Sequence, residues 1–259
     1  MGKAAYYNEI DEFAAEWLRK NMEHGLIAEG EVDTRSIEDV QPDDVKSFTQ
    51  CHFFAGIGTW SYALRLAGWP DDRPVWTGSC PCQPFSAVGK RQGREDARHL
   101  WPQFFRLIQE CSPAIVFGEQ IAGKAGYQWW DIVSADMETR GYACGAANLC
   151  AASVGMAHIR QRLYWVGNSH SKRLEGHTWD DGEKERWPFT AGHLAKTGIH
   201  DCSYQWRDGW DGQCRPVKPG VQLMVDGFPG RNDLLRCIGN AIVPQVAQAF
   251  IETVMEVCE

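Results

Sequence analysis

The feature that most constrains the fold is a short apolar run that meets a glycine turn and then a helix-like stretch. Residues 51–54 are compact and apolar, residues 55–58 read Ala-Gly-Ile-Gly, and residues 59–66 have helical spacing. A strand that turns through glycines into a helix lets a ligand approach bare backbone at the helix N-terminus. A Gly-x-Gly pair alone is equally consistent with a tight structural turn, so other signals must decide between the two.

Strand-like and helix-like runs alternate along most of the chain. Strands are expected at 5–10, 31–33, 51–54, 74–77, 114–117, 142–149 and 158–166, and helices at 11–24, 59–66, 100–111, 129–140 and 245–257. Residues 37–40 suggest a strand edge and a turn, and residues 41–47 a polar connection. This alternation predicts an α/β fold.

Length and composition fit one large domain with a small appendage. The chain has 259 residues, of which 44% are hydrophobic and 23% charged. No apolar run approaches the roughly 20 residues that span a bilayer, and the N-terminus lacks the apolar segment of a signal peptide. Ten cysteines without regular spacing are then expected to be reduced thiols in the cytoplasm, with no membrane partner.

The net charge of −8 is unevenly distributed. Residues 1–50 hold twelve Asp and Glu against five Lys and Arg, which leaves the other 209 residues nearly neutral. A local basic surface can therefore still exist outside the N-terminal region. The global charge does not exclude a nucleic-acid partner.

A cysteine in the segment Pro-Cys-Gln-Pro-Phe-Ser, residues 81–86, is the candidate nucleophile. Cys82 follows the strand-like run 74–77, and a polar, basic loop separates it from the helix-like run 100–111. A cysteine at the end of a buried strand, before such a loop, suits a nucleophile that meets an anionic substrate. For an isolated Pro-Cys pair, however, a buried structural thiol is the simpler interpretation, and it is the one we adopt for Cys80.

Several motifs together resemble those of the DNA cytosine-5 methyltransferases. Residues 81–86 are similar to the family's catalytic motif, and Phe-x-Gly-x-Gly at 54–58 to its S-adenosylmethionine loop. Glu119, followed here by Gln-Ile, resembles its Glu-Asn-Val motif. His-x-Arg-x-Arg at 158–162 resembles its Gln-x-Arg-x-Arg strand, in which the two arginines share one face. Residues 227–229 and 236–244 fit its last two motifs.

The resemblance implies a domain organisation. Residues 1–167 and 236–259 would form a Rossmann-like, S-adenosylmethionine-dependent methyltransferase sheet with helices on both faces. Residues 168–235, which are rich in Gly, Asp, Lys, Arg, His and Trp, would form a small, loop-rich target-recognition region.

The order of the motifs departs from the family. In most members the glycine loop opens the chain, and two strands that end in Asn-Glu and in Asp precede Pro-Cys-Gln. Here only about twenty residues separate Gly58 from Gly78, too few for two strands and two helices. The missing motifs resemble residues 8–10 and 32–34, which predicts strands 2 and 3 first, then 1 and 4, in an unchanged sheet. The alternative is an acidic helical cover over a degenerate adenine site.

The resemblance implies methyl transfer from S-adenosyl-L-methionine to C5 of cytosine in double-stranded DNA, on a base flipped out of the stack. Cys82 would attack C6 and Glu119 would protonate or hydrogen-bond N3. Arg162, with Arg160 beside it, would hold O2.

The same resemblance implies the binding residues. Glu9 would accept the ribose hydroxyls, Ile10 would pack on the adenine, and Asp33 would receive the adenine amino group. The other implied cofactor-binding residues are Phe54, Ala55, Gly56, Ile57, Gly58, Leu100, Asn240 and Ala241. The implied DNA-binding residues are Gln83, Ser86, Lys90, Arg91, Arg94, Arg98, Arg207, Arg215 and Arg231.

Other functions stay open from the sequence. An RNA (tRNA) cytosine-5 methyltransferase on the same scaffold and a catalytically inactive DNA-binding relative are the alternatives to a DNA methyltransferase. The leading interpretation is a monomeric, stand-alone restriction–modification methyltransferase of bacterial or phage origin. No metal is expected, because four His and Cys residues between 193 and 214 lack a tight Cys-x-x-Cys pair.

Overall fold

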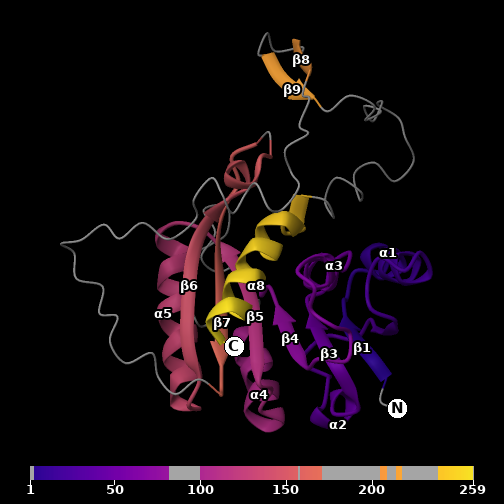
Figure 1. Ribbon diagram of the computed structural model, residues 1–259. Coiled ribbons are helices and arrows are strands. Elements are labelled where there is room, and N and C mark those ends of the chain that lie inside the picture. The colour runs from indigo at the N-terminus through magenta and orange to yellow at the C-terminus, as the bar shows by residue number, and fades with distance from the viewer. Residues whose placement is uncertain are drawn as a thin grey trace, which may run out of the picture.

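The computed structural model describes residues 3–81, 100–156, 158–170, 205–208, 214–217 and 239–258. A seven-stranded sheet forms the centre of this part of the chain (Figure 1). Its strands are β1 (Lys3–Asn8), β2 (Gly30–Asp33), β3 (Phe48–Phe53), β4 (Val75–Gly78), β5 (Ile115–Ile121), β6 (Ala143–Cys150) and β7 (Gln161–Asn168).

The sheet is mixed, with the order β2-β1-β3-β4-β5-β7-β6. All neighbouring pairs from β2 to β5 are parallel, whereas β7 runs antiparallel to both β5 and β6. The carboxyl ends of β1 to β5 and the amino end of β7 therefore lie on one side of the sheet, toward the top of Figure 1. In open α/β sheets ligands bind beyond the carboxyl ends of the strands.

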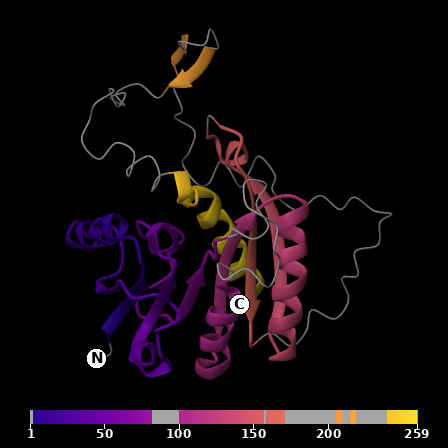
Figure 2. The same ribbon diagram turned by 180° about the vertical axis from the view of Figure 1, so that it is seen from behind.

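Helices cover both faces of the sheet (Figures 1 and 2). They are α1 (Glu12–Glu23), α2 (Pro42–Val45), α3 (Thr59–Leu66), α4 (Trp101–Cys111), α5 (Lys124–Thr139), the 3-10 helix η3 (Ala151–Val154) and α8 (Pro244–Cys258). One core contains Trp60 of α3, Phe117 of β5 and Phe250 of α8. The opposite core contains Phe104 of α4 and Trp129 of α5. The predicted α/β fold with helices on both faces is confirmed.

The first two strands of the chain lie at one edge of the sheet, beyond β3. β1 pairs with β3, β3 pairs with β4, and β2 is the outermost strand. This confirms the predicted order: β1 and β2 occupy the places of the family's second and third strands, and β3 and β4 those of its first and fourth. The alternative, in which the N-terminal residues only cover the sheet, is wrong, because β1 contributes hydrogen bonds to both of its neighbours.

The connection between β2 and β3 contains the expected turn, at residues 37–39, where no strand forms. The polar connection expected at 41–47 contains the one-turn helix α2, which was not predicted. Pro42 occupies the first turn, and Asp44 accepts a hydrogen bond from the Gln41 backbone N–H at 2.9 Å. Proline at a helix start and a capping carboxylate stabilise a helix too short to show an apolar period.

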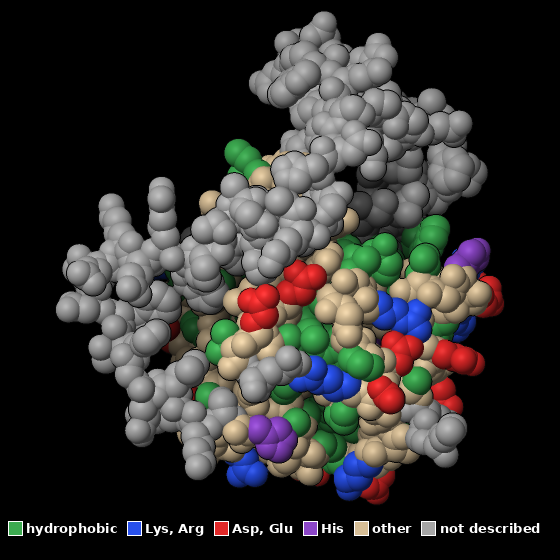
Figure 3. All heavy atoms as spheres, in the orientation of Figure 1, with side chains coloured by type: hydrophobic (Ala, Val, Ile, Leu, Met, Phe, Trp, Pro, Cys, Tyr) green, Lys and Arg blue, Asp and Glu red, His purple; other side chains and the backbone are tan. Residues whose placement is uncertain are grey.

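Acidic side chains lie over this N-terminal part of the molecule, interspersed with Lys and Arg (Figure 3).

A glycine in β5 permits close contact with a buried tryptophan. A Cβ atom at Gly118 would lie 2.2 Å from the ring of Trp165, which is fully buried. We therefore expect Gly118→Ala to lower the free energy of unfolding by about 1–3 kcal/mol, the usual cost of overpacking a core. Gly145→Ala in β6, on the other side of β7, is the matched control, because its Cβ would lie 3.8 Å from Val166. Equal urea midpoints for the two variants would contradict the prediction.

Candidate active site

A cavity of about 720 Å³ opens at the edge of the sheet where the parallel strands end. Its walls come from the residues that follow β1, β2, β3 and β4, from the end of β5, from the start of β7, and from residues 239–242. Its volume is in the range of small-molecule sites, roughly 300–1,000 Å³. The predicted site residues that line it are Glu9, Ile10, Phe54, Ala55, Gly56, Leu100, Glu119, Arg160, Arg162, Asn240 and Ala241.

The glycine loop after β3 has an unusual backbone. Phe54, Gly56 and Gly58 have φ angles of 53°, 56° and 85°, all in the left-handed region. A non-glycine residue such as Phe54 in this region costs of order 1 kcal/mol, and such residues cluster at ligand sites. A Cβ at Gly56 would meet nothing within 4 Å, whereas one at Gly58 would lie 2.9 Å from Ile27. Gly56 therefore borders the cavity with bare backbone, and Gly58 is needed for packing outside the lining.

Glu9 joins the end of β1 to the glycine loop. Its Oε2 accepts a hydrogen bond from the Gly56 N–H at 2.7 Å, and its Oε1 accepts one from the Asp11 N–H at 2.9 Å. Burial raises the pKa of Glu9 above its ordinary value, although both hydrogen bonds act to lower it. Ile10 is 67% exposed and lines the cavity beside it. A carboxylate and an apolar side chain thus lie together at the entrance to the loop.

The deepest charged group of the cavity is Glu119 near the end of β5. Glu119 is 8% exposed, and its Oε1 lies 2.9 Å from Nε of Arg162. Burial raises the pKa of Glu119 to about 7, even though Arg162 and Arg160 both favour the charged form. A carboxyl group with a pKa near neutrality can gain and lose a proton at physiological pH. Glu119 therefore has the properties of a general acid.

Arg160 connects the base of the cavity to the C-terminal segment. Its Nη2 donates a hydrogen bond to the Ala241 carbonyl at 3.0 Å, and its buried Nε has no hydrogen-bond partner among the described residues. Arg160 and Arg162 both line the cavity, which confirms that they face the same side. A buried N–H without a partner is rare in proteins and suits a ligand acceptor.

Gln120 is a site residue that sequence reasoning did not select. Its Nε2 donates a hydrogen bond to the Cys80 carbonyl at 3.3 Å, and its Oε1 accepts one from the Ile121 N–H at 2.9 Å. Nearby, Nε1 of Trp60 donates to Oγ of Ser79 at 3.0 Å. The segment that leads to Cys82 is thus fixed from two sides. The signal available in the sequence was the amide side chain directly after Glu119.

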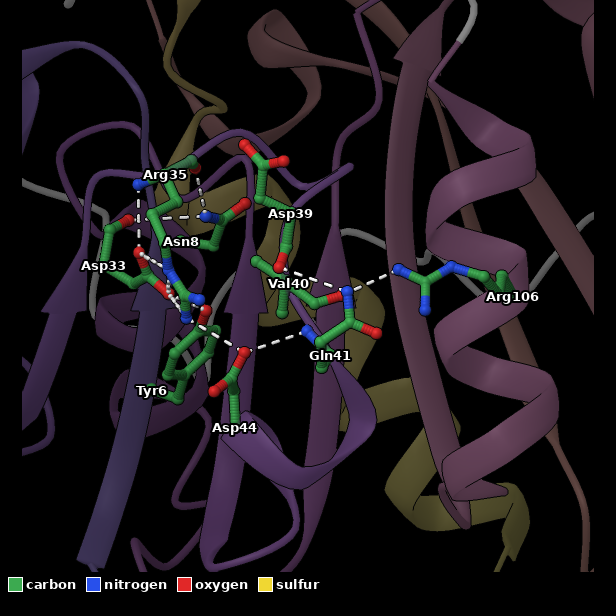
Figure 4. Close-up of polar contacts among 9 residues, drawn as sticks. All are labelled: Tyr6, Asn8, Asp33, Arg35, Asp39, Val40, Gln41, Asp44 and Arg106. Carbon is green, nitrogen blue, oxygen red and sulfur yellow. Dashed lines mark hydrogen bonds and ion pairs between the residues drawn. The ribbon is translucent and has the colours of Figure 1, made fainter.

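Asp33 does not line the cavity. Its Oδ2 accepts hydrogen bonds from the Tyr6 hydroxyl and from Nη2 of Arg35, both at 2.6 Å (Figure 4). Arg35 and Ser36 line the cavity in its place. Direct contact of Asp33 with a cofactor stays a prediction, and in this structure its carboxylate is bound by Tyr6 and Arg35.

Ile57 does not line the cavity, and its carbonyl accepts a hydrogen bond from Nδ2 of Asn21 at 2.9 Å. The remaining predicted residues lie outside the described part of the chain or carry no described side chain. Those outside are Cys82, Gln83, Ser86, Lys90, Arg91, Arg94, Arg98 and Arg231, together with three of the four candidate zinc ligands. Pro81, the residue before Cys82, lines the cavity. Arg207 and Arg215 are register partners in the antiparallel pair β8 (Gln205–Asp208) and β9 (Cys214–Val217).

The described residues contain no group of three His, Cys, Asp or Glu side chains placed to hold a metal ion. No helix in these ranges is long and apolar enough to cross a membrane.

Comparison with known proteins places these residues in a family. Type II methyltransferase M.NgoMIV of Neisseria gonorrhoeae is 26% identical over 154 residues, which cover 58% of this chain and 48% of that protein. Type II methyltransferase M.SacI of Streptomyces achromogenes is 28% identical over 186 residues, which cover 63% of this chain and 48% of that protein. The chain thus spans about half the length of these relatives.

A solved structure shows the same fold. The methyltransferase EhMeth of Entamoeba histolytica superposes with a TM-score of 0.57 at 11% identity, over 98% of this chain and 90% of that one. The model of the C-5 cytosine-specific DNA methylase family matches residues 1–201, a range that includes the glycine loop, the Pro-Cys segment, Glu119 and both arginines. This chain therefore belongs to the C-5 cytosine-specific DNA methylase family.

Proposed function

We propose that this protein transfers a methyl group from S-adenosyl-L-methionine to C5 of a flipped-out cytosine in double-stranded DNA. The observation that carries the proposal is the ion pair between the buried Glu119 and the partly exposed Arg162, in a cavity lined also by the glycine loop and by Pro81, the residue before Cys82. The relatives are Type II methyltransferases, so we extend the proposal to a monomeric modification enzyme in the cytoplasm of a bacterial host.

The residues of the cavity fit S-adenosylmethionine. Glu9 offers carboxylate oxygens that suit ribose hydroxyls, and the exposed side chain of Ile10 offers an apolar surface that suits adenine. The bare backbone at Gly56 allows close approach. Leu100, Asn240 and Ala241 complete the set of proposed cofactor contacts that line the cavity. When bound, the cofactor supplies an electrophilic methyl group.

The chain's own residues would perform the remaining chemistry. Because C5 of cytosine is a weak nucleophile, the Cys82 thiolate would first form a bond to C6. Glu119 would donate its proton toward N3 as electrons move into the ring, and the arginines would stabilise the charge that develops at O2. After methylation, a water molecule would accept the C5 proton, the bond between sulfur and C6 would break to release the Cys82 thiolate, and N3 would return its proton to Glu119 as the aromatic ring is restored.

The experiment has two stages, since the recognition sequence is unknown. Bisulfite sequencing of DNA from cells that express the protein should reveal methylated cytosines in a fixed sequence. A duplex with 5-fluorocytosine at that position should then form a complex that survives denaturation, because fluorine at C5 prevents the release of Cys82. Complex formation should require S-adenosylmethionine. Methylation of tRNA but not of duplex DNA would contradict the proposed substrate, and no methylation of either would indicate an inactive relative.

A further inference from the structure

The loop after β2 holds the Asp33 carboxylate in an unusually complete set of hydrogen bonds (Figure 4). Oδ1 accepts from the backbone N–H of Arg35 at 2.9 Å and from its Nε at 3.0 Å. Oδ2 accepts from Nη2 of Arg35 and from the Tyr6 hydroxyl. A carboxylate has about four lone-pair positions, and these four donors use them. Asp33 therefore has no acceptor position left for a ligand.

The Arg35 guanidinium is fixed by two carboxylates. Besides Asp33, it donates from Nη2 to Asp44 at 2.9 Å, and the Asp44 carboxylate is itself held by the backbone N–H of Gln41, the N-cap residue of α2. Nη1 has no hydrogen-bond partner among the described residues. The Arg35 side chain is 48% exposed and lines the cavity. Arg35 thus presents a donor group of fixed orientation at the wall of the cavity.

The backbone around Arg35 is fixed as well. Nδ2 of the buried Asn8 donates to the Arg35 carbonyl at 2.8 Å and to the Asp33 carbonyl at 3.3 Å. At the far end of the same loop, Nη2 of Arg106 from α4 donates to the Val40 carbonyl at 2.7 Å (Figure 4). A side chain whose backbone and head group are both held loses little freedom when a ligand binds.

We propose that Arg35 is the charged residue that contacts the adenine ring of the cofactor, and that Asp33 is a positioning residue that acts through Arg35. The inference rests on the proposed function, whose cofactor is an adenine nucleoside. Adenine offers ring nitrogens as hydrogen-bond acceptors and a flat π face. A guanidinium with a free Nη1 can donate to the former or stack on the latter. Arg35 would thus contact the adenine in place of Asp33, but as a donor to the ring nitrogens or as a stacking partner and not as the acceptor of the amino group.

The test is a double-mutant cycle, in which calorimetry measures how tightly each variant binds S-adenosylhomocysteine, the product form of the cofactor. Arg35→Met keeps the length of the side chain and removes the guanidinium, so it should weaken binding about tenfold or more, as expected for a charged hydrogen bond. Asp33→Asn alone should weaken binding less, because Arg35 remains. The double variant Asp33→Asn/Arg35→Met should bind no more weakly than Arg35→Met, within about twofold.

Arg106→Met is the matched control, because Arg106 holds the same loop but does not line the cavity. It should change the affinity by less than about threefold. With active enzyme, Arg35→Met should raise the KM for S-adenosylmethionine and leave kcat within about twofold, since it removes an interaction common to ground and transition states. Should Arg35→Met fail to fold, as judged by thermal unfolding, Arg35→Lys keeps a charge for Asp33 and should still weaken binding severalfold, because it lacks the planar fork.

Three results would overturn the inference. In the first, Arg35→Met binds as tightly as the wild type while Asp33→Asn weakens binding in both backgrounds, which would make Asp33 the direct acceptor. In the second, Arg106→Met weakens binding as much as Arg35→Met, which would show that binding depends on the fixed conformation of the loop and not on a contact from Arg35. In the third, the wild-type protein does not bind S-adenosylhomocysteine, which would remove the proposed cofactor itself and is separable from the first two.

Discussion

Replacing Cys82 by alanine is expected to reduce methyl transfer to DNA by about 10⁴-fold or more, the scale of loss when a covalent nucleophile is removed. The reason is that C5 of cytosine becomes nucleophilic only after a bond forms at C6. The binding of S-adenosylhomocysteine should stay within about twofold, because the proposed cofactor contacts lie on other residues. The measurements are incorporation of labelled methyl groups into the duplex found by bisulfite sequencing, and calorimetry.

Cys80→Ala is the matched control for Cys82→Ala. Cys80 is buried, with 4% of its surface exposed, and its carbonyl accepts the hydrogen bond from Gln120. Since that contact uses the backbone, alanine preserves it, and the loss of one buried sulfur should cost no more than about 1–2 kcal/mol of stability. Methylation should survive in Cys80→Ala. Activity in Cys82→Ser or Cys82→Ala would show that Cys82 is not the nucleophile. Loss of activity in a folded Cys80→Ala would show that the Cys80 thiol is needed for the reaction.

Glu119→Gln is expected to lower the rate of methyl transfer by about 10²–10⁴-fold, the usual contribution of a general acid or base. Glutamine keeps the size of the side chain and can donate a hydrogen bond, but it cannot transfer a proton. Glu138→Gln on the exposed side of α5 is the control and should leave the rate unchanged. A Glu119→Gln enzyme within a few-fold of the wild type would show that proton donation is not its role.

The pH dependence of the same enzyme gives an independent measurement. Burial raises the pKa of Glu119 from 4.5 to about 7, so the proton that it donates is lost as the pH rises through that value. The wild-type rate should therefore fall above pH 7, whereas the residual rate of Glu119→Gln should not follow this titration.

The effect of Glu119 on stability has the same sign. A carboxyl group whose folded pKa is raised contributes stability that is complete below its unfolded pKa of 4.5 and is lost as the pH rises through about 7. Urea unfolding of the wild type between pH 5 and pH 8 should show this loss, and Glu119→Gln should show less of it.

Much of the architecture could be predicted because it depends on near neighbours in the chain. The helix expected at 59–66 is α3, with the same bounds. The rearranged strand order followed from the resemblance of residues 8–10 and 32–34 to family motifs, together with the short spacing between Gly58 and Gly78, since about twenty residues cannot hold two strand–helix units. α2 was missed because one helical turn has no apolar period and is stabilised by capping alone. The bounds of the target-recognition region stay a prediction.

The sequence by itself predicted the α/β fold, because periodicity is a property of the chain alone, and the strand order, because its motifs resemble those of the family in a different order. Only the tertiary structure decided which partners the motif residues bind. It placed the Tyr6 hydroxyl on the Asp33 carboxylate, across |i−j| = 27, and it joined Gln120 to Cys80, across |i−j| = 40. It also set the pKa of Glu119, because burial depends on every atom that packs around the carboxyl group. A side chain's protonation and its free hydrogen-bonding positions are consequences of neighbours that are distant in sequence.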